Sequence, residues 1–449
     1  MRIFRFAKGI AAFLVGVMLV QLLHACGPSS RAGDRTQLTI ATVNNGDMVV
    51  MQDLSRQFEE ENPDIELRWV VLEENILRQR TTTDVASGGG QFDVMTIGAY
   101  EVPIWAKRGW LKSLDQLPAD YDVDDLITPI RQGLSQDGNL YALPFYGESS
   151  MLYYRQDLFD EAGITVSGTP TYQQVEEWAS EVNDPSNGVY GMCLRGKPGW
   201  GENMAFITTM VNTFGGRWFD MDWEPQLDSP EWNEAVSFYI NLLQEYGPPG
   251  ASSNGFNENL ALFSTGKCGM WIDATVAAGL LSNPDVSEVA DQVGFAPAPV
   301  ASYPNGSNWL WTWALGIPQT SRSPEAAQRF ITWATSKDYI QLVAERSGWV
   351  SVPPGTRTST YENPNYQQVA PFASTVLTSI EAADIESPAA EPTPYKGVQY
   401  VDIPEFQAIG TQVGQRMAAA LAGQVSVEQA LSRSQGVAER FMRHTGYIE

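Results

Sequence analysis

The sequence predicts an α/β protein built from two lobes. Apolar, β-branched segments alternate along the chain with segments of helical periodicity, which is the usual pattern of helices packed on a sheet. With 449 residues the chain is longer than one hydrophobic core usually supports, so we expect two lobes. No internal repeat of fixed period is visible.

The first 25 residues are typical of a targeting segment that precedes the fold. A basic start is followed at residues 9–23 by an apolar run that is too short to cross a bilayer and suits the core of a secretion signal. The sequence LHACG at 23–27 then resembles a bacterial lipobox, in which a lipid is attached to the Cys, here Cys26. We therefore expect a lipoprotein signal peptide at 1–25 and a lipidated Cys with its tether at 26–36, with an ordinary signal peptide as the alternative.

Composition excludes several classes of partner. The formal net charge is −25, and it becomes −28 once residues 1–25 with their three basic side chains are removed. Nucleic acids and anionic lipid surfaces attract basic proteins, so we expect neither nucleic acid nor the lipid surface itself as a partner. The 14 Trp, 17 Tyr and 18 Phe residues are plentiful, and some of them are expected to line a ligand site.

The strands and helices of the first part follow in a regular order. Residues 38–43 form a buried strand closed by Asn44-Asn45-Gly46, and apolar residues at helical spacing follow it. A second strand at 65–72 leads into a helix that ends at the glycines 88–90, and a third strand covers 92–97. Because no Lys-Ser or Lys-Thr follows these glycines and no helix starts there, they indicate a turn rather than a phosphate-binding loop.

Later helices are marked by their capping residues. The sequence SPE at 229–231 supplies an N-cap, a Pro at the first helical position and an early acid, and apolar residues then repeat at helical spacing up to Gly247. The same sequence at 323–325 opens another helix, and the chain from 404 onward is mostly helical. Strands are expected at 189–194 and 268–272.

The residue types available exclude much catalytic chemistry. The chain has two histidines, His24, which is removed with the signal peptide, and His444. One remaining histidine excludes His-dependent nucleophilic triads and imidazole-based zinc sites. Because carboxylates are abundant, residue types alone do not exclude a glycosidase that uses two acids. We expect no catalytic residue, no metal and no cofactor. Cys193 and Cys268 either form a disulfide or stay buried as free thiols, and both remain open.

Several ordered motifs resemble one protein family. They are residues 138–144 (GNLYALP), 148–155 (ESSMLYYR), 157–163, 170–178 and 263–270 (FSTGKCGM). With the lipobox, this set resembles family 1 extracellular solute-binding proteins, the sugar-capturing partners of ABC importers. Residues 193–203 and 271–275 look like the sorbitol/mannitol-binding branch of that family.

The resemblance implies a type II-like periplasmic-binding-protein fold of two α/β lobes, with several chain crossings and a ligand cleft between the lobes. We expect an N-terminal lobe at 37–146 and 275–322, and a C-terminal lobe at 147–274 and 323–449. The expected partners are a sugar or sugar alcohol, the transmembrane subunits of an ABC importer, and the membrane through the lipid on Cys26. We expect an exported, lipid-anchored monomer in the periplasm or at the cell surface.

The candidate ligand residues follow the ends of strands, where ligands bind in open α/β sheets. Carboxylates and guanidinium groups bind adjacent hydroxyls in pairs, and flat aromatic rings pack against C–H faces. The side chains at such ends are Asn44, Asn45, Tyr100, Glu148, Arg195 and Asp273. The aromatic candidates are Trp200 between two glycines, Trp309 and Trp311 of an alternating set that includes Trp313, and Trp349.

Each of these residues has a structural alternative. The structural alternative is a hinge carboxylate for Glu148, the partner of a surface acid for Arg195 and an N-cap for Asp273. Glu202 and Asn203 are expected to open a helix and are left out of the site. The alternatives for the whole protein are a surface glycosidase or lyase using two acids, and a receptor for a non-sugar solute.

Overall fold

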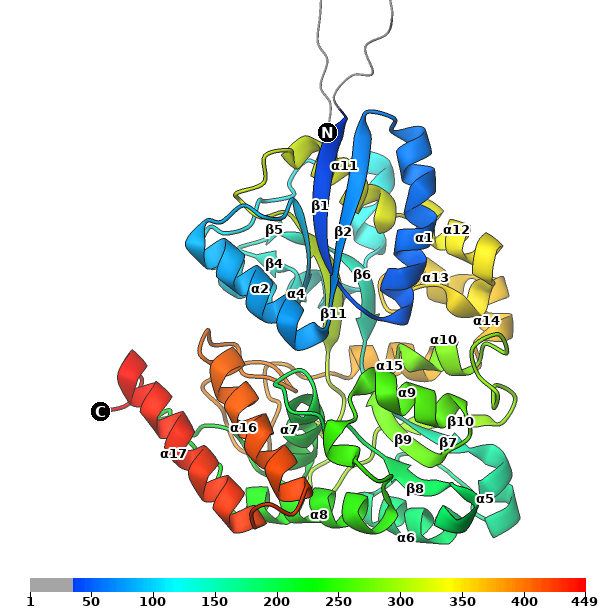
Figure 1. Ribbon diagram of the computed structural model, residues 1–449, viewed down its shortest axis with the longest axis vertical. Helices are drawn as coiled ribbons and strands as arrows, with labels where there is room; N and C mark the ends of the chain where they lie inside the picture. The colour runs from blue at the N-terminus through cyan, green and yellow to red at the C-terminus, as the bar shows by residue number, and fades with distance from the viewer. Residues whose placement is uncertain (1–34) are drawn as a thin grey trace, which may run out of the picture.

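The computed structural model describes residues 35–449, and the predicted signal peptide and Cys26 lie outside the described residues. Two lobes, each a sheet with helices packed on it, lie one above the other in Figure 1. The two-lobe α/β architecture expected from the sequence is present. Among residues 35–449, no helix is long and apolar enough to cross a membrane.

The N-terminal lobe is built on a five-stranded sheet of order β2-β1-β3-β11-β6. Strand β1 runs parallel to β2 and β3, while β11 runs antiparallel to β3 and β6. Every residue of β3 and β11 is buried, because helices or loops cover both faces of the sheet. The strands are β1 (Thr36–Val43), β2 (Ile65–Leu72), β3 (Val94–Gly98), β6 (Ala142–Glu148) and β11 (Trp311–Gly316).

The helices of this lobe begin and end at residues the sequence marks. Asn45 caps α1 through its side chain, which accepts a hydrogen bond from Met48 N, and α2 ends at Gly88 in the left-handed conformation. The glycines after α2 form a turn, as expected. The elements are α1 (Gly46–Glu61), α2 (Glu74–Ser87), α3 (Glu101–Lys107), α4 (Thr128–Gly133), the small hairpin β4 (Ser135–Gln136) and β5 (Asn139–Leu140), α11 (Pro324–Ala334), α12 (Lys337–Ser347), α13 (Thr358–Glu362) and α14 (Pro364–Val369).

The C-terminal lobe has a four-stranded sheet of order β10-β7-β9-β8. A disulfide joins Cys193 at the end of β8 to Cys268 at the start of β9, which resolves the choice that the sequence left open. The strands are β7 (Ser150–Arg155), β8 (Tyr190–Cys193), β9 (Cys268–Ala274) and β10 (Val293–Pro297). The helices are α5 (Gln156–Ala162), α6 (Tyr172–Val182), α7 (Asn203–Thr213), α8 (Pro230–Tyr246), α9 (Phe256–Ser264), α10 (Ala277–Leu281), α16 (Phe406–Leu421) and α17 (Val427–Thr445).

Within residues 35–449 the chain passes between the lobes at three places. Ser149 alone connects β6 to β7, and residues 298–310 connect β10 to β11. The third passage follows α14, through α15 (Ala373–Glu381), which contacts β6 of one sheet and β7 and β10 of the other. In Figure 1 this helix lies at the level where the lobes meet.

The expected lobe boundaries require two corrections. Strand β10 lies within 275–322, which was assigned to the N-terminal lobe, but it pairs with β7 in the C-terminal sheet. Helix α11 lies within 323–449, assigned to the C-terminal lobe, but it packs on α1, β1 and β6 of the N-terminal lobe. Helix α12 follows it there, with Tyr339 against Phe145 of β6. Pro-rich breaks locate loops, but they do not tell on which sheet the next element packs.

Candidate functional site

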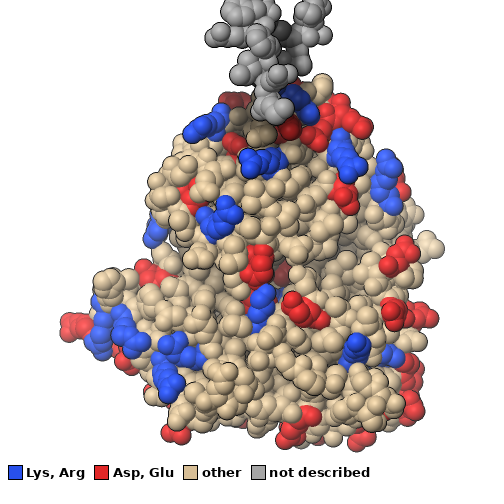
Figure 2. Space-filling model, viewed as in Figure 1, with Lys and Arg blue, Asp and Glu red and all other residues tan. Residues whose placement is uncertain are grey.

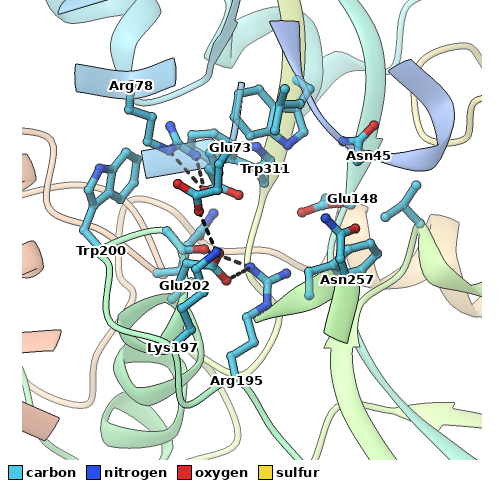
Figure 3. Close-up of a pocket in the computed structure, with 18 of the residues that line it drawn as sticks. Asn45, Glu73, Arg78, Glu148, Arg195, Lys197, Trp200, Glu202, Asn257 and Trp311 are labelled. Carbon is cyan, nitrogen blue, oxygen red and sulfur yellow. Dashed lines mark hydrogen bonds and ion pairs between the residues drawn. The ribbon is translucent and has the colours of Figure 1, made fainter. Parts of the chain in front are cut away.

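A cavity lined by polar and aromatic side chains lies between the lobes. This cavity has a volume of about 190 Å³, far more than one water molecule requires. Both lobes line it (Figure 3). Its N-terminal lining includes Asn44, Asn45, Glu73, Glu74, Arg78, Tyr146, Glu148, Trp311 and Trp313. Its remaining lining includes Arg195, Lys197, Trp200, Glu202, Phe256, Asn257, Glu258, Trp309 and Gln399.

The N-terminal lobe presents Asn45 and Glu148 from the ends of strands. Asn45 lies between β1 and α1, where the same side chain that caps the helix donates a hydrogen bond from Nδ2 to the Tyr146 hydroxyl at 2.8 Å. Glu148 is the last residue of β6, opposite Trp311 in the sheet. The sheet therefore fixes the backbone from which both side chains reach the cavity.

Arg195 is held by Asp273, which lies behind it. Arg195 Nε and Nη2 donate to the two carboxylate oxygens of Asp273 at 2.9 and 2.6 Å, and Nη1 donates to Gly201 O at 2.8 Å. Asp273 also accepts from Trp271 Nε1 at 3.0 Å and from Ala274 N at 2.7 Å. Burial alone would lower the pKa of Arg195, but the attraction of Asp273 raises it above its usual range, so the guanidinium stays charged.

Arg78 on α2 lies among three Trp rings. Its guanidinium carbon is 4.1 Å from the ring centroid of Trp200 and 4.7 Å from those of Trp311 and Trp313. Its nitrogens donate to Glu74 at 2.9 Å and to Glu101 at 2.7 Å. Because Trp200 belongs to the other lobe, this cation–π contact also joins the lobes.

Glu148 is a buried carboxylate without a hydrogen-bond partner among the described residues. Its exposed fraction is 6%, and Figure 3 draws its carboxylate facing the open space. Burial raises the pKa of Glu148 well above its usual range; Arg195 opposes this shift, and the negative charges of Asp273, Glu74 and Asp47 reinforce it. The group is therefore suited to bind a ligand hydroxyl as a proton donor or acceptor.

Glu202 stands at the start of a helix, as expected from the sequence, but it also lines the cavity from which the sequence analysis left it out. It stands at the N-cap position of α7 but makes no capping hydrogen bond. Its Oε1 is 3.2 Å from Lys197 Nζ, while Oε2 is buried without a hydrogen-bond partner. Burial and the nearby negative charge of Glu74 raise the pKa of Glu202 to about 7, although the positive charges of Arg195 and Lys197 act to lower it.

Polar contacts close the cavity across the junction of the lobes. Lys197 Nζ lies 2.6 Å from Glu73 Oε1, and Asn257 Nδ2 donates to Asn44 O at 3.1 Å. Figure 2 shows acidic and basic side chains together at this junction, on a face where most of the surface carries neither charge. In this conformation the two lobes are in contact around the cavity.

Two of the cavity's indole groups have free hydrogen-bond donors. Trp309 Nε1 and Trp200 Nε1 are both buried and have no partner among the described residues. Unpaired buried donors are rare in proteins, so each is a candidate donor to a ligand oxygen. Trp313 also lines the cavity, although the sequence favoured Trp309 and Trp311.

Of the ten predicted ligand residues, seven line the cavity and three do not. Tyr100 is buried, and its hydroxyl donates to Ile403 O of the other lobe at 2.8 Å. Asp273 orients Arg195 from behind, and Trp349 lies in a short 3-10 turn (Trp349–Ser351) that packs against α10, α12 and α14. The seven are Asn44, Asn45, Glu148, Arg195, Trp200, Trp309 and Trp311.

Sequence reasoning missed several cavity residues. Glu73 directly follows β2, so the same strand-end rule could have identified it. Arg78 and Glu74 lie four residues apart on a helix. This spacing is typical of an ion pair on an exposed helix surface, so it does not indicate a ligand site. Asn257 and Lys197 carry no signal that distinguishes them from surface residues.

The cavity offers hydrogen-bond donors and acceptors from both lobes between aromatic walls. This chemistry suits a small, uncharged molecule rich in hydroxyl groups. Among residues 35–449, no group of three or more His, Cys, Asp and Glu side chains is arranged to hold a metal ion.

Comparisons with known proteins point to the same chemistry. The family model described as bacterial extracellular solute-binding protein matches residues 45–341. A mannitol-binding protein of Pseudomonas aeruginosa is 56% identical to this chain over 410 residues, covering 91% of this chain and 94% of the relative.

Solved structures agree with this match. An ABC transporter solute-binding protein from Agrobacterium vitis S4, crystallised with bound D-mannitol, has a TM-score of 0.91 and 59% identity, over 92% of this chain and 100% of that chain. A solute-binding protein from Agrobacterium radiobacter K84 in complex with ribitol has a TM-score of 0.80 and 26% identity, over 91% of this chain and 99% of that chain.

Proposed function

Because this chain belongs to the bacterial extracellular solute-binding protein family, we propose that it captures an acyclic sugar alcohol, with mannitol as the reference ligand, and delivers it to an ABC importer. The observation that carries the proposal is a cavity that both lobes line with unpaired polar groups and aromatic rings. The relatives are solute-binding proteins rather than enzymes, so the carboxylates of the cavity serve binding and not catalysis.

Binding couples to closure because the cavity is divided between the lobes. Asn45, Glu148 and Trp311 come from the N-terminal sheet, while Arg195 and Trp200 come from the other lobe. A ligand that contacts residues of both lobes binds the closed conformation more tightly than the open one. This difference in affinity sets how far the ligand shifts the protein toward closure. The transmembrane subunits of the importer then recognise the closed protein.

The ligand's hydroxyls and carbon chain meet different parts of the cavity. Glu148, Glu202 and the two free indole N–H groups satisfy hydroxyls, and the Trp rings pack against the C–H surface. Arg195 is the fixed cation of the site because Asp273 holds its guanidinium in one orientation. Water displaced on closure leaves these hydrogen bonds in a drier environment, which strengthens them.

Thermal denaturation with a panel of ligands tests the proposal. The panel contains D-mannitol, D-sorbitol, ribitol, glucose, maltose and a mixture of amino acids. A ligand at a hundred times its dissociation constant stabilises the protein by about 2.7 kcal/mol, which moves the melting temperature by several degrees. We expect the hexitols to give the largest rise; a rise with maltose or amino acids and none with any alditol would contradict the proposal.

The protein is exported, as the family implies, and we propose that Cys26 carries the lipid that keeps it at the membrane. The variant Cys26→Ser should be found in the soluble extracytoplasmic fraction of the native host, whereas the wild-type protein should be found in the membrane fraction. Export itself should be retained, since the apolar run at 9–23 is unchanged. Equal membrane association of both forms would contradict the anchor. We further propose that the protein acts as a monomer, which light scattering of the purified protein would check.

A further inference from the structure

Acidic groups outnumber cationic groups around the cavity. The cations that line it are Arg78, Arg195 and Lys197. Each is already engaged by carboxylates: Arg195 by Asp273, Arg78 by Glu74 and Glu101, and Lys197 by Glu73 and Glu202. This leaves Glu148 as a buried carboxylate with no cation of its own.

The surroundings of Glu148 do not neutralise it. The charges that act on Glu148 are the positive charge of Arg195, which lines the same cavity, and the negative charges of Asp273, Glu74 and Asp47; Tyr146 also lines the cavity. Arg195 is the only cation in this set, and its Nε, Nη1 and Nη2 are all bound to Asp273 or Gly201. An isolated buried carboxylate is strongly disfavoured, so Glu148 holds either a proton or a positively charged group of the ligand.

Glu148 stands at one side of the cavity. Figure 3 draws it with Asn45 and Asn257, apart from the cluster that contains Glu202 and Lys197. A group at the end of an extended ligand can therefore meet Glu148 while the rest of the chain reaches the aromatic wall. A primary ammonium is close in size to a hydroxyl group and has three donors to offer.

We propose that the cavity also binds protonated amino-alditols, with a terminal ammonium group paired to Glu148, and that it excludes aldonates. This inference rests on the proposed function and extends its ligand class. An aldonate carboxylate would meet Glu148 or Glu202 with like charge, and no cation lining the cavity lacks a carboxylate partner.

The two ligand types differ in their proton balance. A neutral alditol binds with Glu148 protonated. The ammonium complex has no proton on Glu148, because the ligand's own positive charge pairs with the carboxylate, so it holds one proton fewer on this residue than the alditol complex does. The affinity of the amino-alditol relative to the alditol therefore rises with pH while the amine remains protonated.

Calorimetric titration of the protein with D-mannitol, 1-amino-1-deoxy-D-mannitol and D-mannonate tests this. From pH 6 to pH 8 the ratio of amine to mannitol affinity should rise by about tenfold or more, and mannonate should bind roughly a hundredfold more weakly than mannitol. In Glu148→Gln the ratio should fall by about tenfold and lose its pH dependence. The control Glu345→Gln, which removes an equal charge from the exposed face of α12, should keep the wild-type ratio.

The following results would overturn the inference. The first is an amine that binds more than about tenfold more weakly than mannitol at pH 8. The second is the same pH dependence in Glu148→Gln as in the wild type. If that variant does not fold, wild-type titrations in two buffers of different ionisation enthalpy replace it. Binding of the amine with about one bound proton fewer than mannitol supports the pairing, and equal proton exchange with both ligands overturns it. Mannitol binding without amine binding rejects this inference alone, whereas absence of both rejects the proposed function.

Discussion

At the residue level, Asp273 acts on the ligand through Arg195. It lies outside the cavity and gives both carboxylate oxygens to the guanidinium that lines it. Asp273→Asn would leave Arg195 buried with a weaker partner, and breaking such a buried pair costs about 3–5 kcal/mol of unfolding free energy. We expect both a large fall in the denaturant midpoint and a loss of mannitol affinity of about tenfold or more. A variant that binds normally would show that Arg195 does not need this partner.

The free indole N–H of Trp309 provides a second prediction. Trp309→Phe keeps an aromatic wall but removes the donor, and one hydrogen bond contributes about 1 kcal/mol, so mannitol affinity should fall about fivefold. Trp349→Phe is the matched control, because this Trp packs against helices outside the cavity lining. Calorimetry with mannitol compares the two. Equal affinities would mean that the N–H does not meet the ligand.

Part of the site could be predicted from the sequence because strand ends are visible there. Asn44, Asn45, Glu148 and Arg195 all follow apolar strand segments, and all line the cavity. Tyr100 also lies near a strand end, but its hydroxyl binds Ile403 O, a partner that is distant in the sequence. Glu202 was missed because an acidic residue at a helix start usually caps the helix, and here it turns toward Lys197 instead.

At the level of elements, the disulfide ties the ligand-binding loop to the sheet. Strand β8 is a short strand of four residues at the edge of its sheet, paired with β9, and Arg195 follows it two residues after Cys193. The bridge closes a loop with a sequence separation of 75 residues, for which the chain-entropy treatment gives about 4 kcal/mol of stabilisation.

The double variant Cys193→Ala/Cys268→Ala should therefore unfold at clearly lower denaturant concentration than the wild type. We also expect weaker mannitol binding, because loosening of β8 frees the backbone that carries Arg195. Denaturant titration with and without reductant measures the first effect and calorimetry the second. Identical midpoints for the oxidised and reduced wild type would contradict the stabilising role of the bridge.

Local patterns predicted the elements better than their assembly. The strands at 38–43, 65–72 and 268–272 and the helix opened by Ser229 all match the structure closely, since periodicity and caps are properties of nearby residues. The assignment of β10 and α11 to lobes was wrong, because the lobe in which an element packs depends on partners far along the chain.

At the level of the whole molecule, the lobes are held together by groups that also face the ligand. The pair Glu73–Lys197, the contact of Arg78 with Trp200 and the bond from Asn257 to Asn44 all cross the junction. Closure therefore depends on the charge state of the cavity as well as on the ligand. Sequence alone could not show this, since the residues of each pair are more than a hundred positions apart.

Glu202 makes the closed arrangement sensitive to pH. Burial raises the pKa of Glu202 from 4.5 to about 7 in the closed protein, and opening would return it toward the ordinary value. The closed form thus binds more protons than the open form between these values. Its stabilisation by protonation is complete below about pH 4.5 and is lost as pH rises through 7, with an upper limit on the order of 3 kcal/mol.

We therefore expect the ligand-free protein to be more open at pH 8 than at pH 5.5. Small-angle X-ray scattering should give a larger radius of gyration at the higher pH, and saturating mannitol should remove most of the difference because the ligand favours closure. In Glu202→Gln the side chain cannot ionise, so the radius should change much less with pH. An equal response of the variant and the wild type would assign the pH dependence to another group, of which Glu148, the other buried carboxylate of the cavity with a raised pKa, is the first to replace.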